Sequence, residues 1–576
     1  MDSNRSSPHR TIGKFKTARV SLERLGFLQF FIFLIFVTLL FQITQLALFY
    51  QSSLHARAAS QYRLVTEIPP LRGEIQDRNG QGLAVNLKVP SVYVIPRILN
   101  SEQKDHLSQE LARILSVSRS FVRERFKRDK AFVWIKRRIT PEEAKKIEAL
   151  TSPAVGIQYE YKRFYPHTQL LANLLGFTNI DNRGIEGIEK VADSDLAGKP
   201  GKRYTRRDAL GREIRAFEEK MIPALDGHRV VLTIDRQLQY VTERALDRSY
   251  KKWKAKGAVA ILMNPQTGEI LAMATRPTFD PNSPGSYPFE SYRNRVLTDM
   301  FEPGSVFKIV TATAVLSERK ITLTDKIDCE NGTWTWGIKT LHDVHGYGLL
   351  TFPEIIIKSS NIGTVKLARR LRPNKLHQYI KRFGFGAKTG IDLEGEAPGF
   401  VRPPSKWSRT TPYAVPIGQE IMVTPLQLLR AVSMIANGGY LVKPYVVDRV
   451  EDVHGIILRK NKPLLKGPDL EPQVTELMKE VLWKATEEGG TGKAAHVEGI
   501  PVAGKTGTAQ KVTPGGSYSH SNFVGSFIGF APADHPLLSM VVMVDDPRPM
   551  YYGGVVAAPV FSEVMEAALA YLGHSA

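Results

Sequence analysis

The sequence predicts an α+β fold in which an antiparallel sheet is packed by helices, behind a single N-terminal transmembrane helix and an elongated module without catalytic motifs. Strand-like runs lie at both ends of residues 226–576, with helical patterns between them. An uncharged stretch occupies residues 25–54. The chain of 576 residues is also too long for one ordinary core, so several folded units are expected.

The uncharged stretch predicts a transmembrane anchor at residues 25–50, because a helix of that length spans a bilayer core of about 30 Å. Residues 1–24 are rich in Lys and Arg and contain only two acidic residues, Asp2 and Glu23. The positive-inside rule therefore predicts a cytoplasmic tail at 1–24 and an exported remainder. The alternative is a signal peptide cleaved near Ala56-Arg57-Ala58, although signal h-regions are usually only about 7–15 residues long.

The composition argues against a wholly disordered chain and against a nucleic-acid-binding protein. Hydrophobic residues make up 43% of the chain and charged residues 23%, as in a globular protein. The net charge of +21 comes from scattered Lys and Arg, which argues against nucleic-acid binding and favours attraction to anionic lipid or an acidic polymer. Cys329 is the only cysteine, so an intrachain disulfide is excluded.

Residues 51–225 are predicted to form the non-catalytic module. Asp77-Arg78-Asn79-Gly80 marks a tight turn between two extended pieces. Helices are expected at 102–115, where Leu recurs at spacing four, and at 141–150, where Pro141 takes the first helical position.

Residues 226–576 are predicted to form the second domain. Asp235 is expected to cap one of its helices. The expected strands are 230–234, 258–263, 270–274, 502–511, 523–530 and 538–544, and the expected helices are 235–250, 306–316 and 559–572.

The first candidate catalytic motif is Ser305-Val306-Phe307-Lys308. It follows a Pro-Gly pair that is expected to start a helix. Residues three apart share a helix face, so the Lys308 amine is expected beside the Ser305 hydroxyl. A desolvated lysine can be neutral and take the serine proton, which makes a nucleophile of a weak alcohol. Ser101-Glu102-Gln103-Lys104 has the same spacing, so the pattern alone means little.

Two further motifs are separated from Ser305 along the chain. Ser359-Ser360-Asn361 lies on a break between two apolar runs, where Ser359 would relay a proton and Asn361 would bind an amide; ordinary cap chemistry is the alternative. Lys505-Thr506-Gly507-Thr508 lies in a strand-like run, where Gly507 would let a ligand approach the backbone and the Lys and Thr side chains would hold a carboxylate. Lys388-Thr389-Gly390 repeats these letters, but its Gly-rich context predicts a loop.

The order and spacing of the three motifs resemble those of penicillin-binding proteins and serine β-lactamases. The middle motif has Ser360 where the commonly quoted form has Asp. The resemblance to class B penicillin-binding proteins covers nearly the whole chain behind the anchor, and the segments 302–308, 389–393 and 505–511 are most similar to the division-specific septal type. The module landmarks that carry it are Arg72-Gly73-Glu74-Ile75, Asp77-Arg78-Asn79-Gly80, Leu83-Ala84, Arg163, Tyr165-Pro166, Leu175-Gly176-Phe177, residues 184–189, Asp208-Ala209 and Gly211-Arg212-Glu213.

The resemblance implies a transpeptidase domain at 226–576 that cross-links peptidoglycan stem peptides, in a bacterial cytoplasmic membrane and with the catalytic domain outside. Ser305 would form the acyl-enzyme, and β-lactams would block it covalently. The implied catalytic residues are Ser305, Lys308, Ser359, Asn361 and Lys505, and the implied substrate-binding residues are Thr506, Gly507 and Thr508. The backbone N–H groups of Ser305 and Thr508 would form an oxyanion hole.

The resemblance implies no cofactor and no metal. For His342-Asp343-Val344-His345, a structural role near the Ser-Ser-Asn loop is preferred to a zinc site. The expected protein partners are a polytopic membrane glycan polymerase and other division proteins, with no nucleic acid. Three alternatives stay open: an elongation-type transpeptidase of the side wall, a catalytically dormant divisome scaffold, and a serine β-lactamase.

Overall fold

The computed structural model describes residues 22–48, 63–128, 130, 132–207, 213–214, 220–336, 339–513 and 515–574. The signal-peptide alternative near Ala56, most of the predicted tail and the landmarks at 208–212 lie outside the described residues. Contacts between Cα atoms divide the chain into two compact units, residues 1–67 with 202–223, and residues 68–201 with 224–576.

The first unit contains the predicted apolar helix α1 (Leu22–Leu48). Its described side chains are exposed, its mean hydropathy reaches 2.3, and its 27 residues extend about 40 Å. The helix therefore has the length and composition of a membrane span. The same unit holds a small sheet of β1 (Arg63–Ile68), β6 (Gly201–Arg207), β7 (Glu213–Ile214) and β8 (Lys220–Ile222).

One other described helical stretch, Gly553–Tyr571, is long and apolar enough to span a membrane. It comprises α18 (Gly553–Val556) and α19 (Ala558–Tyr571), and 56% of it is buried inside the second unit. Its apolar side chains are therefore accounted for by the domain core.

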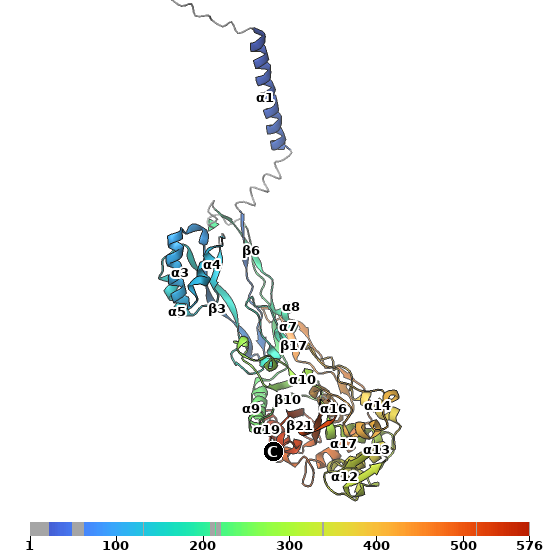
Figure 1. Ribbon diagram of the computed structural model, residues 1–576. Helices are drawn as coiled ribbons and strands as arrows, with labels where there is room; N and C mark the ends of the chain where they lie inside the picture. The colour runs from blue at the N-terminus through green and yellow to red at the C-terminus, as the bar shows by residue number, and fades with distance from the viewer. Residues whose placement is uncertain are drawn as a thin grey trace, which may run out of the picture. The chain divides into compact units, whose positions relative to one another are not determined.

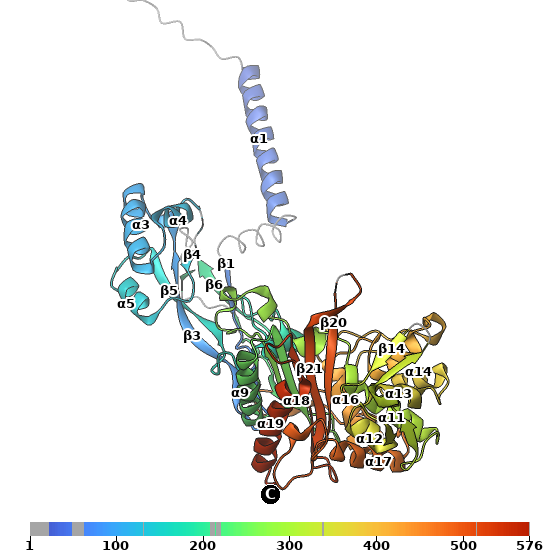
Figure 2. The same cartoon turned by 60° about the horizontal axis from the view of Figure 1, so that its bottom comes forward.

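A five-stranded antiparallel sheet forms the centre of the second unit, in the order β11-β10-β22-β21-β20 (Figure 2). Strands from both ends of the predicted domain meet in it, as the sequence predicted. The strands are β10 (Gly257–Met263), β11 (Ile270–Arg276), β20 (Ala503–Val512), β21 (Tyr518–Ala531) and β22 (Leu538–Asp545).

The sheet is buried on both faces, which explains why β10 has no polar alternation. Val259 and Ile261 belong to one hydrophobic cluster, shared with α11 (Lys308–Ser317) and α16 (Pro425–Ala436). Ala260 and Leu262 point the other way and belong to the cluster of α9 (Arg236–Lys252) and α19. Further helices of residues 226–576 are α12 (Phe352–Ile357), α13 (Asn361–Ala368), α14 (Pro373–Arg382) and α17 (Pro472–Lys484) (Figure 1).

The predicted module and the predicted second domain share a seven-stranded sheet whose main path is β18-β17-β9-β2-β3-β4. Strands β2 to β5 come from the module, and β9, β17 and β18 come from residues 226–576. Three helices cover part of it, and Leu107, Leu111 and Leu115 of α3 enter their shared core. The predicted turn at residues 77–80 connects β2 and β3, and a capping box at Thr140 starts α5. The elements are β2 (Ile75–Gln76), β3 (Gly82–Val94), β4 (Val133–Lys136), β5 (Val155–Phe164), β9 (Arg229–Leu232), β17 (Val447–Glu451), β18 (Ile457–Lys460), α3 (Ser101–Leu115), α4 (Arg119–Phe126) and α5 (Pro141–Glu148).

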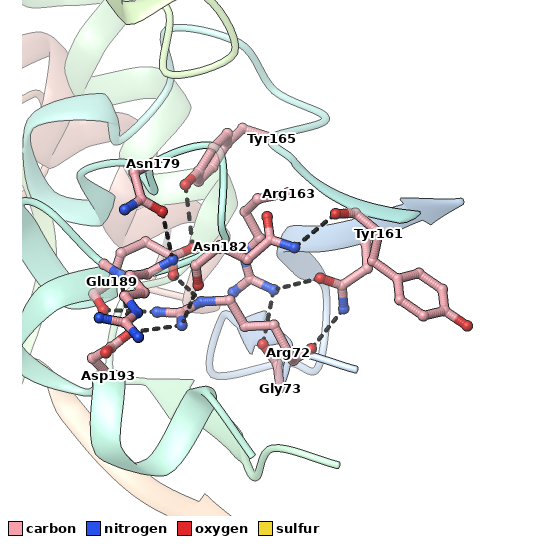
Figure 3. A network of polar contacts seen from close by, with 12 residues as sticks. Arg72, Gly73, Tyr161, Arg163, Tyr165, Asn179, Asn182, Glu189 and Asp193 are labelled. Atoms are coloured by element: carbon pink, nitrogen blue, oxygen red, sulfur yellow. Dashed lines mark hydrogen bonds and ion pairs between the residues drawn. The ribbon is translucent and has the colours of Figure 1, made fainter. Parts of the chain in front are cut away.

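Several landmark residues of the module meet in one buried polar network around Glu189 (Figure 3). Arg72 Nε donates to one Glu189 oxygen at 2.7 Å, and Arg163 Nε donates to the other at 2.6 Å. Arg72 also pairs with Asp193 at 2.6 Å, and the Tyr165 hydroxyl contacts Glu189 at 3.2 Å. Because the two arginines come from β-rich segments about 90 residues apart, Glu189 ties distant parts of the module together.

Candidate active site

Ser305 lies in a short 3-10 turn, η4 (Gly304–Phe307), that leads into α11. The sequence predicted a plain helix from Val306, and the difference matters because side chains at positions i and i+3 eclipse each other in a 3-10 turn. Ser305 and Lys308 therefore lie on the same side of the chain, as expected. The Ser305 side chain is partly exposed, and its hydroxyl makes no hydrogen bond within the described part of the chain.

Lys308 is completely buried at the start of α11. Its Nζ donates to the Ser359 carbonyl at 2.6 Å and to Asn361 Oδ1 at 2.7 Å, and it lies 3.2 Å from Ser359 Oγ. Burial lowers the pKa of Lys308 well below its ordinary value of 10.5, and the neighbouring Lys505 lowers it further. The first and second predicted motifs thus meet at one amine.

The Ser-Ser-Asn motif connects α12 to α13, as predicted. Ser359 has a left-handed backbone with φ of 58°, an uncommon conformation for a non-glycine residue, and its carbonyl accepts from Lys308. Ser360 caps α13 by accepting from the Gly363 N–H at 2.9 Å. The alternative of cap chemistry is therefore correct for the middle residue, while both flanking residues contact Lys308.

Asp343 holds this loop in place. Its carboxylate accepts from the Asn361 N–H at 2.5 Å, the Ile362 N–H at 3.1 Å and the Ser360 hydroxyl at 2.6 Å. The carbonyl of His342 accepts from Asn361 Nδ2 at 2.8 Å. The predicted structural role near the Ser-Ser-Asn loop is confirmed, although the sequence did not single out the carboxylate. Within the described residues, no group of three or more His, Cys, Asp and Glu side chains could hold a metal ion.

Lys505 lies on β20, the edge strand of the central sheet, and is completely buried. Desolvation by burial lowers its pKa from 10.5 to about 7. Thr506 donates to the Thr491 hydroxyl at 2.9 Å, and the Thr508 hydroxyl accepts from the Gly553 N–H at 3.2 Å. The third motif is therefore in a strand, as predicted.

The space beside Gly507 is filled by protein. A Cβ at this position would lie 2.4 Å from Ser526 Oγ and 2.8 Å from Val306 Cγ1. Glycine is thus needed so that β20 can pack against the turn that carries Ser305. The structure therefore gives Gly507 a packing role against the turn that carries Ser305, and close approach of a ligand at this position stays a prediction.

Five of the predicted residues open onto one cleft of about 800 Å³: Ser305, Ser359, Asn361, Thr506 and Thr508. A wall of this cleft is aromatic, since Phe523 stacks on Tyr551 with ring centroids 3.9 Å apart and Tyr552 lies beside Tyr551. The adjacent Tyr551-Tyr552 pair was the available sequence signal for this wall, and the sequence analysis missed it.

Neither of the repeated motif patterns belongs to this cleft. Lys388-Thr389-Gly390 lies in a loop, as predicted, where the Thr389 and Gly390 N–H groups donate to Glu396. Ser101 opens α3 of the module.

The comparisons with known proteins agree with this geometry. A family model described as "Penicillin binding protein transpeptidase domain" matches residues 258–566, and one described as "Penicillin-binding Protein dimerisation domain" matches residues 67–232. The chain belongs to this family. Its predicted family, fold and enzyme class are confirmed: it is a penicillin-binding transpeptidase of class B, which pairs the two domains.

The relatives are similar over most of their length. Stage V sporulation protein D of Bacillus subtilis is 39% identical over 88% of this chain and 79% of its own. Peptidoglycan D,D-transpeptidase FtsI of Escherichia coli is 32% identical over 87% of this chain and 84% of its own. Among solved structures, penicillin-binding protein 3 of Mycobacterium tuberculosis, complexed with aztreonam, has a TM-score of 0.69 at 26% identity and covers 88% of this chain and 97% of its own.

Proposed function

We propose that this penicillin-binding protein is a peptidoglycan D,D-transpeptidase that acts through a Ser305 acyl-enzyme with Lys308 as general base. The observation that carries the proposal is the hydrogen bonding of Lys308. A neutral amine has two N–H donors and one lone pair. The two short bonds to the Ser359 carbonyl and Asn361 Oδ1 use both donors, so the lone pair is on the side of the hydroxyls: it faces Ser359 Oγ at 3.2 Å and would accept the Ser305 proton.

In the proposed reaction, Ser305 Oγ attacks the carbonyl of the penultimate D-Ala of a stem peptide, and its proton passes to Lys308. The bond to the terminal D-Ala breaks, and Ser359 with Lys505 returns a proton to the leaving amine. The amine of a second stem peptide then attacks the ester, which forms the cross-link and frees Ser305. The backbone N–H groups of Ser305 and Thr508 would stabilise the oxyanion, each by roughly 3 kcal/mol.

Substrate binding is assigned by position in the cleft. Thr506 and Thr508 line it from β20 and would hold the terminal carboxylate, with Lys505 supplying positive charge. Asn361 lines the cleft from the Ser-Ser-Asn motif and would bind a substrate amide. Gly507 would serve the site by its small size.

Labelling with a fluorescent penicillin tests the enzyme proposal. The wild-type protein should form one stable adduct, and the Ser305→Ala variant should form none. An adduct that persists in Ser305→Ala would overturn the assignment of the nucleophile. Sustained hydrolysis of the penicillin would favour the serine β-lactamase, and absence of any adduct in the wild type would favour the dormant scaffold.

We further propose that α1 is a retained anchor with residues 1–24 in the cytoplasm and the catalytic unit outside, because Lys and Arg flank the helix on its N-terminal side. Residues 51–225 would act as a pedestal that contacts other division proteins, and α1 would pack against a polytopic glycan polymerase. Protease added outside intact spheroplasts should digest the catalytic domain; full protection would contradict this topology.

A septal role is proposed from the likeness of residues 302–308 and 505–511 to the division-specific type. Depletion of the protein should produce filaments. Round cells would instead indicate the elongation-type alternative.

A further inference from the structure

An aromatic platform lies beside the catalytic cleft and has no part in the proposed reaction. It consists of Trp334, Trp336 and Tyr413, whose ring centroids lie 6.1–6.4 Å from one another. The two tryptophans are on β13 (Thr333–Trp336), which pairs with β14 (Lys339–His342). Residues two apart on a strand share a face, so both indoles point to the same side of this hairpin.

The platform is anchored in the domain but open at its surface. Trp334 and Tyr413 are half-buried and pack against a small hydrophobic cluster, whereas Trp336 is 47% exposed. The cluster consists of Leu341, Ile362, Val365 and Ile417. An indole left half in water is not explained by core packing, because burying it would remove a large apolar area from solvent.

The platform is continuous with the cleft. Ile417 belongs to the hydrophobic cluster against which Tyr413 and Trp334 pack, and it also lines the cleft. The hairpin continues directly into His342, whose carbonyl holds the Asn361 side chain. Figure 2 shows β14 next to α13, the helix that Asn361 begins. A substrate whose peptide occupies the cleft would therefore have its remaining part near these rings.

A polar partner is indicated by Arg369. Its guanidinium lies 4.1 Å from the centroid of Trp336, which fixes it over the ring. In the part of the chain that the structure describes, this guanidinium donates no hydrogen bond, so its five N–H donors face solvent or a ligand. By contrast, the nearby Lys366 is held by Glu330 at 2.6 Å.

We infer that the platform is a sugar subsite, which binds the glycan strand that carries the stem peptide. This inference rests on the proposed function, since peptidoglycan joins peptides to a chain of N-acetylated amino sugars. A pyranose ring presents a face of C–H groups that packs on an indole, and its hydroxyl and acetamide oxygens accept hydrogen bonds. Trp336 and Arg369 supply both complements side by side.

Binding of peptide-free glycan strands to the full-length protein in detergent micelles tests the inference. The strands are prepared by amidase treatment and labelled at one end, and binding is followed by fluorescence anisotropy. Trp336→Ala should weaken binding about tenfold, Trp336→Tyr should restore most of it, and Arg369→Ala should weaken it as well. The matched control is Trp483→Ala, because Trp483 is 41% exposed on α17 and has no place in the platform.

Acylation by a small fluorescent penicillin is measured in parallel and should be unchanged in all four variants. That readout shows that each variant is folded, and it tests Ser305 independently of the glycan. The inference is overturned if peptide-free strands do not bind the wild type, or if Trp336→Ala and Arg369→Ala bind them as tightly as Trp483→Ala does. A missing penicillin adduct together with normal glycan binding would instead contradict the proposed function.

Discussion

Two completely buried lysines face the same small volume, and their burial determines their chemistry. Lys308 and Lys505 both lose hydration, and a like charge nearby further disfavours the charged form of Lys308. The two amines can therefore differ in charge, with Lys308 neutral and Lys505 protonated. Each role has a different dependence on pH.

The pH dependence of Ser305 acylation follows from these directions. The proposed reaction needs neutral Lys308, and because its pKa is well below 10.5 the neutral base forms at a lower pH than for an ordinary lysine and is lost as the pH falls through the lowered pKa. The proposed reaction also needs charged Lys505, and this charge is lost as the pH rises above about 7. We therefore expect a bell-shaped profile in the second-order rate constant for acylation by a fluorescent penicillin. A rate that climbs steadily to about pH 10 would show that Lys308 titrates near its ordinary pKa.

Asp343→Asn should impair acylation without abolishing folding. One carboxylate oxygen accepts both N–H bonds of α13, so the amide can keep these, but it loses the negative charge and places its nitrogen where the other oxygen accepts from the Ser360 hydroxyl. We expect acylation to slow about tenfold, the loss of roughly one charged hydrogen bond. Since the Asp343 carboxylate raises the pKa of Lys308, its removal should also shift the acidic limb to lower pH.

The control for this variant is Asp328→Asn, which changes an exposed carboxylate on the neighbouring segment. Among the described residues, this carboxylate accepts from the Glu330 N–H alone. Its profile should match that of the wild type. An Asp343→Asn profile with an unmoved acidic limb and a wild-type rate would remove Asp343 from the positioning of the loop.

At the scale of elements, the site depends on how closely β20 packs on η4. The contact is made at Gly507, where the absent side chain makes room for Val306. The edge position of β20 leaves one side of the strand free to border the cleft. A shift of this strand would separate Lys505 from Lys308.

Gly507→Ala should therefore cost about 1–3 kcal/mol of stability through overpacking and should slow acylation as β20 moves away from Ser305. Urea unfolding and the penicillin acylation rate measure the two effects. Gly285→Ala is the matched control, because a Cβ there meets nothing within 4 Å. If Gly507→Ala acylates as fast as Gly285→Ala, the close packing is not needed for catalysis.

At the scale of the whole molecule, Glu189 connects segments of the module that are distant in sequence. Its two oxygens are used by Arg72 and Arg163, and all three side chains are buried. Removing one charge from such a group leaves the others uncompensated in a region of low dielectric constant.

Glu189→Gln is expected to destabilise the protein by roughly 3–5 kcal/mol, measured by chemical denaturation. Glu394→Gln provides the comparison, since Glu394 pairs with Lys190 at the exposed surface, where water screens the pair, and the substitution should change the stability little. Equal stabilities for the two variants would show that the buried network is not a stabilising device.

The sequence by itself determined the helices and strands with strong local patterns, the apolar helix and the family. Asp235 and Thr140 start helices where predicted, because a cap acts on N–H groups two or three residues away. The consecutive apolar residues of β10 predicted a strand, and this strand is buried on both faces. These signals are local, and local chemistry is enough to read them.

Only the tertiary structure decided how the three motifs work together. Lys308 meets Ser359 and Asn361 across about 50 residues, and Gly507 meets Val306 across about 200. The depth of burial that lowers the lysine pKa values, the carboxylate of Asp343 and the platform at Trp336 likewise depend on which distant segments pack together. Side-chain identity specifies what a group can do, but the neighbours that set its pKa and its contacts come from the folded chain.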